Sequence, residues 1–250
     1  GKISMAGYTY GQAPSTPTLT DRTGDLNAQV TYSYAAADSG SVQTWDISNP
    51  PALNAGTYRM FARIGATSNY YEYNAEYCEF VVAKATPPYT KPTGLTAKYG
   101  QTLADVTLTD GWSWMDSSES VGGASTAAKT FQAKFTPTDA VNYNMVENIG
   151  LEVMVNKADQ SALTITGAGS VIYGQTLTLT TTGGSGTGTV TYRIDTDAST
   201  GEATIDPETG VLTPVKVGSV SVIATKAGDN DYNDVTSAPF VLMIKPATPT

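Results

Sequence analysis

The 250-residue chain has no histidine and only one cysteine, Cys78. Without histidine, a Ser–His–Asp triad, a papain-like Cys–His pair and any zinc site with a histidine ligand are impossible. A single cysteine cannot form a disulfide within the chain, so each folded part must be stabilised by its own core. The 23 acidic residues form no recognisable carboxylate pair of the kind that glycosidases use. The composition therefore favours a protein that is not an enzyme.

Long apolar runs are also absent, because no stretch approaches the ~20 residues that a membrane helix needs, and no signal peptide is recognisable. Only 15% of the residues are charged, and the net charge is −9. This excess of negative charge repels phosphate backbones and anionic lipids, so we expect no nucleic-acid partner and no membrane insertion. We interpret the acidity as a means of keeping an extracellular protein soluble.

Helical patterns are scarce, since few windows place apolar residues at helical spacing. Glycine (24 residues) and proline (13 residues) are frequent, as are serine and threonine. These residues favour short strands joined by turns. The sequence therefore predicts an all-β protein.

An internal repeat organises the chain. Tyr-Gly-Gln occurs at residues 10–12, 99–101 and 173–175. A second motif, an Asx-Tyr pair in which Asx is Asn or Asp, occurs at residues 69–70, 142–143 and 231–232. In each case an exit dipeptide begins 14 residues after that tyrosine, and its members are Lys84-Ala85, Lys157-Ala158 and Pro246-Ala247. Several motifs in one order at near-constant spacing indicate repeated structural modules.

The segment before each exit alternates apolar residues with residues of the other face, as a strand with one buried face does. The side chains predicted to face inward are Cys78, Phe80, Val82, Leu151, Val153, Val155, Phe240, Leu242 and Ile244. Cys78 is thus predicted to be a buried, unreactive thiol. A second alternating segment precedes each Asx-Tyr pair and ends at Ala62, Ala133 and Ala224.

The repeats predict three modules, residues 1–86, 87–158 and 159–247, each a small β-sandwich. The segments that join them are short and contain proline, so we expect tandem modules in an extended array. Residues 247–250 copy the start of the first joining segment, so we expect a further module to follow. Only the polar middle of the first module, residues 20–51, departs from the repeat pattern.

The first two modules resemble the YGX-type MBG repeats of bacterial surface proteins. The resemblance rests on Tyr-Gly-Gln, on Asp-Gly-Trp-Ser-Trp at residues 110–114, on residues 135–143 and on the Lys-Ala exit. The third module also resembles the group 2 bacterial Ig-like domains, through residues 208–218. The resemblance implies tandem immunoglobulin-like β-sandwich modules in a secreted, cell-surface or cell-wall attached protein. It implies a non-catalytic stalk or spacer, or an adhesin, and it carries no catalytic residues.

Acidic residues in two predicted loops are candidate calcium ligands: Asp195, Asp197, Asp229 and Asp231. The loop from residue 195 to 201 places oxygen-bearing side chains at alternate positions, as hard cations require. It differs from an EF-hand loop, whose sixth residue is glycine and whose twelfth is glutamate, because Thr200 and Asp206 stand there. Aspartate is also an ordinary turn residue. We therefore expect no cofactor, with calcium as the alternative.

Aromatic side chains offer a second function, the binding of a glycan or of a host or matrix protein. Trp112 and Trp114 share one strand face, where they either form a platform for a sugar or pack in the core. The tyrosines among residues 69–73 have the better chance of exposure, because adjacent strand residues point to opposite faces. The two hypotheses are a spacer and an adhesive module, and in both we expect a monomer whose regular partners are the neighbouring domains.

Overall fold

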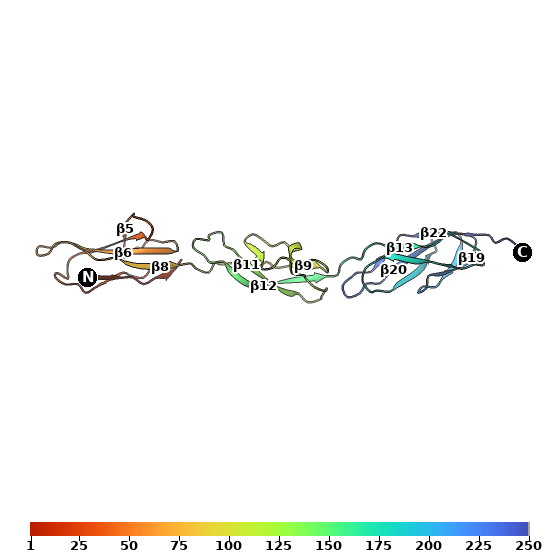
Figure 1. The fold of residues 1–250 in the computed structure, drawn as a ribbon, viewed down its shortest axis with the longest axis horizontal. Helices are drawn as coiled ribbons and strands as arrows, with labels where there is room; N and C mark the ends of the chain where they lie inside the picture. The colour runs from red at the N-terminus through yellow and green to blue at the C-terminus, as the bar shows by residue number, and fades with distance from the viewer. Residues whose placement is uncertain (250) are drawn as a thin grey trace. The chain divides into compact units, whose positions relative to one another are not determined.

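The computed structural model describes residues 1–249, which are strands, turns and loops almost throughout (Figure 1). Among these residues the one helical element is the 3-10 turn η1 (Leu103–Asp105). The predicted all-β fold is confirmed. No helix in the described part of the chain is long and apolar enough to cross a membrane.

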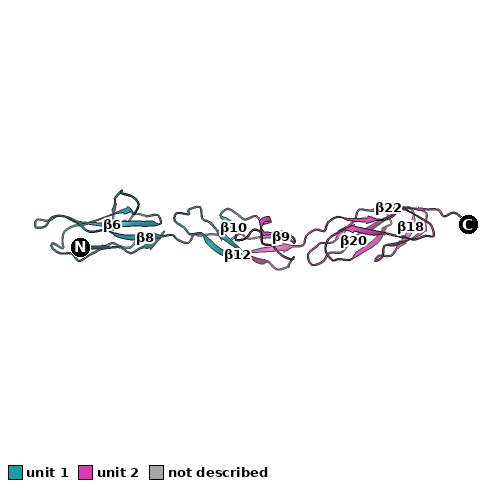
Figure 2. Cartoon of the chain, in the orientation of Figure 1, with its two compact units in different colours: residues 1–91, 108–115, 132–149 teal, residues 92–107, 116–131, 150–250 magenta. Residues whose placement is uncertain are grey.

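The chain divides into two compact units (Figure 2). Unit 1 consists of Gly1–Lys91, Leu108–Met115 and Gln132–Ile149, and unit 2 of Pro92–Thr107, Asp116–Phe131 and the chain from Gly150 onward. The first repeat (residues 1–86) thus belongs to unit 1 and the third repeat (residues 159–247) to unit 2.

The first repeat is a pair of sheets around one core. Its strands are β1 (Lys2–Ser4), β2 (Tyr8–Thr9), β3 (Thr18–Thr20), β4 (Val30–Ala36), β5 (Gln43–Trp45), β6 (Gly56–Ile64), β7 (Tyr73–Asn74) and β8 (Cys78–Ala83). The larger sheet has the order β2-β8-β6-β4-β5, with β7 also on β6, and β1 pairs with β3. Ile3 from the small sheet and Met60 from the large sheet belong to the same buried cluster. This packing of two sheets is the predicted β-sandwich.

The second repeat (residues 87–158) contributes one sheet of four strands. These are β9 (Leu95–Lys98), β10 (Trp112–Trp114), β11 (Lys129–Phe135) and β12 (Val146–Asn156), in the order β10-β11-β12-β9. In unit 1 the short strand β10 is antiparallel to β11, with Trp114 opposite Ala133. In unit 2 β9 is parallel to β12, with Leu95 opposite Val153.

The third repeat contains three sheets in unit 2. Its strands are β13 (Leu163–Thr166), β14 (Ser170–Ile172), β15 (Leu177–Thr178), β16 (Thr180–Gly183), β17 (Val190–Asp195), β18 (Glu202–Ile205), β19 (Val211–Lys216), β20 (Gly218–Lys226), β21 (Val235–Thr236) and β22 (Phe240–Lys245). The orders are β14-β22-β20-β17 with β21 on β20, β15-β19-β18, and β13-β16. Leu212 and Leu242 come from different sheets and pack in one core.

One parallel pair recurs in all three repeats. The strand that carries Tyr-Gly-Gln at its end lies parallel to the closing strand: β2 beside β8, β9 beside β12, and β14 beside β22. Parallel neighbours run in the same direction, so both strands of each pair end at the same edge of the module. The Tyr-Gly-Gln turn and the exit dipeptide are therefore brought together.

The closing strands β8, β12 and β22 have the predicted register. Of the nine residues predicted to face inward, the seven that are fully buried are Phe80, Val82, Leu151, Val153, Val155, Leu242 and Ile244. Cys78 and Phe240 are only half-buried. Both are the first residue of their strand. Leu151, in contrast, lies inside β12, which begins at Val146.

The prediction of a buried Cys78 is therefore corrected. The thiol packs against the edge of the core, and partial burial raises its pKa, with smaller opposing effects from backbone hydrogen bonds at Met5 and at Cys78 itself. The raised pKa disfavours the reactive thiolate, so the predicted low reactivity rests on protonation as well as on packing.

Two adjacent valines of β8 test the register. Val82 is 1% exposed and Val81 is 51% exposed. Replacing Val82 with Ala removes two buried methyl groups and should destabilise the first repeat by about 2 kcal/mol. Val81→Ala makes the same chemical change on the open face and should cost less than about 0.5 kcal/mol. Amide hydrogen exchange at the residues of the first repeat measures both changes, and equal effects would refute the register.

Candidate functional site

The recurring motifs of the sequence meet at two places, which we call junctions. The first junction lies within unit 1 and consists of Tyr10, Lys84, Ala85, Asn142 and Tyr143. The second junction lies within unit 2 and has the same members in the same roles: Tyr99, Lys157, Ala158, Asp231 and Tyr232. Each junction connects the exit of one repeat to the Asx-Tyr pair of the next.

The Tyr-Gly-Gln motif is a tight turn. The glutamine N–H donates to the carbonyl three residues earlier in all three copies, at 3.0 Å for Gln12, 3.2 Å for Gln101 and 3.0 Å for Gln175. The central glycines have φ between 81° and 88°, a region that side chains disfavour and that the third residue of a type II turn needs. The turn ends the strand and leaves the tyrosine projecting from the edge of the module.

A backbone bridge forms the centre of each junction. The N–H of Ala85 donates to the carbonyl of Asn142, and the N–H of Asn144 donates to the carbonyl of Ala85, both at 2.9 Å. In the second junction Ala158 exchanges the corresponding bonds with Asp231 and Asn233, again at 2.9 Å. The exit alanine thus adds a one-residue parallel strand to the following repeat.

The exit lysines bind backbone carbonyls of the following repeat. The Nζ of Lys84 donates to the carbonyl of Ala140 at 2.6 Å, and Lys157 donates in the same way to the carbonyl of Asp229. Each acceptor lies three residues before the tyrosine of the Asx-Tyr pair. The spacing that defined the repeat is therefore explained by a contact between repeats.

The Asx side chain makes the return contact. The Oδ1 of Asn142 accepts the N–H of Ala55 at 2.8 Å, and the Oδ1 of Asp231 accepts the N–H of Ala124 at 2.7 Å. Asn142 is only 6% exposed, and its amide nitrogen donates to Asn54 and to Asp139. An Oδ1 acceptor is what both positions share, whereas the amide donors of Asn142 have no counterpart at Asp231.

Two tyrosine pairs complete the junctions. The rings of Tyr10 and Tyr143 have centroids 5.4 Å apart at 84°, and those of Tyr99 and Tyr232 are 5.3 Å apart at 80°. These are edge-to-face contacts, the favourable arrangement for aromatic rings. All four tyrosines are half-buried. The junctions therefore combine backbone, charged, polar and aromatic contacts, and they are suited to holding repeats together.

Two of the four calcium candidates lie at the second junction: Asp231 is a member, and the carbonyl of Asp229 accepts the ammonium group of Lys157. The carboxylate of Asp229 accepts the backbone N–H groups of Thr187, Asp231 and Tyr232 at 2.7–2.9 Å. These bonds lower the pKa of Asp229 to about 2, and the bond from Thr187 has the largest effect. Its oxygens serve as caps for a loop, which is the ordinary use of aspartate in turns.

The other two calcium candidates lie at the end of β17. Asp195 is its last residue, and its carbonyl accepts the hydroxyl of Ser199 at 2.6 Å, while Asp197 follows in the loop. Within residues 1–249 no group of three or more Asp, Glu, Cys and His side chains is arranged to hold a metal ion. The calcium hypothesis stays a prediction.

The aromatic candidates divide between core and surface. Trp112 and Trp114 are buried, at 9% and 8% exposure, and Tyr89 packs edge-on against Trp112 at 5.4 Å. The tyrosines predicted to be exposed are so: Tyr70 is 55% exposed, Tyr71 97% and Tyr73 48%. These three line a surface pocket of about 380 Å³ in unit 1 together with Gly1, Thr23, Asp25, Ala28, Ile64 and Gly65.

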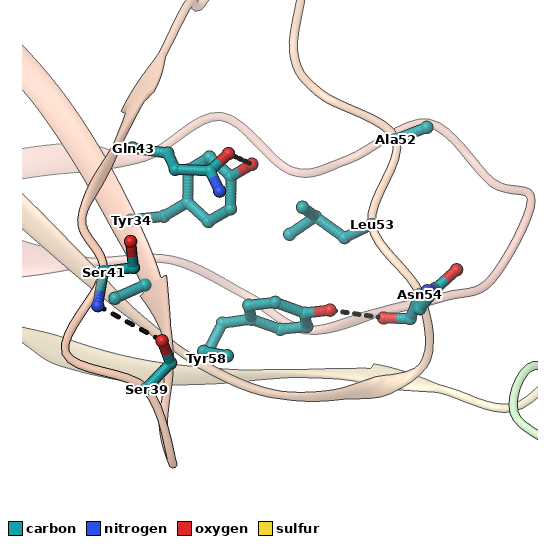
Figure 3. A pocket seen from close by; sticks show the side chains of 10 residues that line it. Tyr34, Ser39, Ser41, Gln43, Ala52, Leu53, Asn54 and Tyr58 are labelled. Atoms are coloured by element: carbon teal, nitrogen blue, oxygen red, sulfur yellow. Dashed lines mark hydrogen bonds between the residues drawn. The ribbon is translucent and has the colours of Figure 1, made fainter.

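A second pocket of about 250 Å³ lies beside β4 and β6 in the first repeat (Figure 3). The phenol of Tyr34 donates to Oε1 of Gln43 at 2.8 Å, and that of Tyr58 donates to the carbonyl of Asn54 at 2.9 Å. Burial, with smaller effects of Tyr34 and Asp38, raises the pKa of Tyr58. A neutral phenol with its proton engaged in a hydrogen bond is not a nucleophile.

No family model and no curated relative matches the chain. Among solved structures, protocadherin gamma B2 extracellular cadherin domains 3–6 match at 11% identity and TM-score 0.31, over 98% of this chain and 77% of that one. Drosophila N-cadherin EC1-4 matches at 11% identity and TM-score 0.26, over 90% and 69%. The S-layer protein rSbsC(31-844) matches at 12% identity and TM-score 0.31, over 99% of this chain and 41% of that chain.

The acceptor role of Asp231 can be tested with two substitutions. Asp231→Ala removes the oxygen that accepts the N–H of Ala124, while Asp231→Asn keeps one, as Asn142 does in the first junction. Loss of the bond, worth about 1 kcal/mol, should accelerate amide hydrogen exchange at Ala124 roughly fivefold in the alanine variant. The asparagine variant should exchange at close to the original rate. Equal acceleration in both variants would show that charge, and not the acceptor, matters.

Proposed function

We propose that the chain is a non-catalytic spacer segment of a bacterial secreted or cell-surface protein. Its modules are residues 1–86, 87–158 and 159–247, joined in an extended array that holds another domain away from the surface. The observation that carries this proposal is the repeated junction. The residues that recur between repeats outside the cores are those that bind one repeat to the next.

The parallel strand pairs β2–β8 and β14–β22 support the same function. Because β2 and β8 run in the same direction, the chain leaves the first repeat at the edge where β2 ends, opposite to the edge where β2 begins. The third repeat has the same arrangement, with β14 parallel to β22. Modules built in this way pass the chain from one end to the other. Each then adds its own length, and contacts between neighbours suffice for stability.

Small-angle scattering tests the extended array. Modules about 35 Å long, from strands rising about 3.3 Å per residue, would give a rod of about 100 Å with a radius of gyration near 30 Å. A single compact body of this length would give about 18 Å, so a value below about 22 Å would refute the array.

A matched pair of variants ties the scattering result to the junction. Tyr143→Ala removes one ring of the first junction and should lower the radius of gyration, because a looser connection samples bent arrangements. Tyr77→Ala removes a ring that packs on Phe61 within the first repeat, and this variant should keep the original radius of gyration.

The exposed tyrosines favour a second candidate function, that of an adhesive module for a glycan or a host or matrix protein. Tyr70, Tyr71 and Tyr73 gather at one pocket, where Asp25 and Thr23 add polar groups. Exposed aromatic patches rimmed by polar residues are typical of interaction sites. Aromatic faces with a few placed polar groups are also the usual lining of small-ligand sites.

A glycan array distinguishes the two functions. Tyr71 is 97% exposed, so Tyr71→Ala should not disturb the fold, and it should abolish any glycan signal if the pocket is the binding site. Tyr77→Ala, a change at a tyrosine outside the pocket, should keep the signal. A signal that survives Tyr71→Ala would exclude this pocket, and the absence of any signal would exclude glycan binding.

A further inference from the structure

The parallel strand pair of each repeat also decides how that repeat responds to tension. Its first strand is β2, β9 or β14, and its second is the closing strand β8, β12 or β22. One further bond extends each pair, because the tyrosine of the Tyr-Gly-Gln turn donates its N–H to a carbonyl of the closing strand. The donors and acceptors are Tyr10 and Ala83 at 2.8 Å, Tyr99 and Asn156 at 2.9 Å, and Tyr173 and Lys245 at 2.9 Å. We call each pair with this bond the clamp of its repeat.

Tension on the chain loads a clamp along its length. A pull toward the N-terminus draws the first strand back past its start, and a pull toward the C-terminus draws the closing strand onward past its end. Because the two strands are parallel neighbours, these pulls slide them past each other in opposite directions. All the backbone hydrogen bonds between them are then strained at once. Strands separated from one end, in contrast, lose their bonds one after another, which needs less force.

The clamp remains after the outermost strand of a repeat has been pulled away. In the first repeat the strand before β2 is β1, which pairs with β3 in the smaller sheet. In the third repeat β13 precedes β14 and pairs with β16. Release of β1 or β13 leaves the closing strand joined directly to β2 or β14. In the second repeat β9 is the first strand, so tension acts on its clamp from the start.

We propose that the chain bears tension, and that the clamp is the part of each repeat that must break before the repeat unfolds. The proposal rests on the spacer function, because a spacer that holds a domain away from a surface carries any force applied to that domain. A repeat of this kind need not be unusually stable at rest. Forced unfolding is governed by the unfolding rate, and here the barrier lies in breaking the bonds of one strand pair together.

Pulling single molecules in two directions tests the loading. In the first arrangement the full chain is held at its two ends. In the second, one handle is attached to a cysteine introduced at the exposed Gln175, just after β14, and the other stays at the C-terminal end. Both measurements use the Cys78→Ser background, so that the introduced thiol is unique.

The second arrangement pulls β14 and β22 apart from the end where both finish. The third repeat should therefore open at a severalfold lower force than when the chain is held at its two ends. No repeat should unfold in the first arrangement at the force that opens the third repeat in the second. Equal forces in the two arrangements would overturn the proposal.

One bond of the third clamp can be removed without removing the turn. The N–H of Gln175 donates to the carbonyl of Ile172, so Tyr173 is the second residue of the turn, where a type II turn favours proline. Tyr173→Pro removes the N–H that Lys245 accepts, and the third repeat should unfold roughly fivefold faster at a given force. Tyr173→Ala keeps this N–H and removes a ring that is 49% exposed, so it should unfold at the original rate.

A bond outside the clamp provides the matched control. The hydroxyl of Ser237, which is buried, accepts the N–H of Ala224 on β20 at 3.0 Å. Without tension, both Ser237→Ala and Tyr173→Pro should accelerate amide hydrogen exchange in the third repeat. Under tension only Tyr173→Pro should unfold faster. Equal acceleration of the two variants under tension would show that overall stability, and not the clamp, sets the response.

Failure of this proposal is distinguishable from failure of the spacer function. A radius of gyration below about 22 Å would refute the extended array itself. An extended chain whose third repeat yields at the same force in both pulling directions would still be a spacer, but it would not be one whose clamps bear tension.

Discussion

The exit alanines Ala85 and Ala158 are the points on which the contacts between repeats depend. Their positions are fixed by the parallel pairing of the closing strand with the strand that ends in Tyr-Gly-Gln. That pairing places a backbone N–H and carbonyl beside a projecting tyrosine at one edge of the module. The bridge, the lysine contact and the ring pair each contribute about 0.5–3 kcal/mol by the usual values for such contacts. Because they act across a covalent link, even these modest energies define how one repeat meets the next.

The sequence predicts the closing strands well because their pattern is local. Period-two alternation places seven of nine side chains in the core, and the two that are only half-buried, Cys78 and Phe240, start their strands. The polar middle of the first repeat gives no such signal. Strands β4 and β5 form there, and Tyr34 and Trp45 are buried, because β4 pairs along its own whole length with β6. Such pairing is a tertiary effect that no local pattern reveals.

The junctions show where sequence reasoning ends. The motifs, their order and their spacing are all visible in the sequence, but their contacts join residues far apart in the chain, such as Tyr10 and Tyr143. The aspartates show a related ambiguity. Oxygen atoms at alternate loop positions suit both a hard cation and backbone N–H donors. In the structure Asp229 and Asp231 accept N–H groups, while calcium binding at these residues stays a prediction.

The two junctions differ in charge but share their backbone bonds. In the second, Lys98 pairs with Asp159 at 2.8 Å, and Asn233 donates to the same carboxylate at 3.0 Å. Both members of this ion pair are more than half exposed, so screening leaves it little stabilising effect. The first junction uses the neutral Asn142 where the second has Asp231. The features common to both are a neutral bridge, a lysine on a carbonyl and two tyrosine rings, none of which needs a carboxylate. Either residue supplies the Oδ1 atom that accepts a backbone N–H of the preceding repeat, and the amide of Asn142 adds donors to Asn54 and Asp139 that are particular to the first junction.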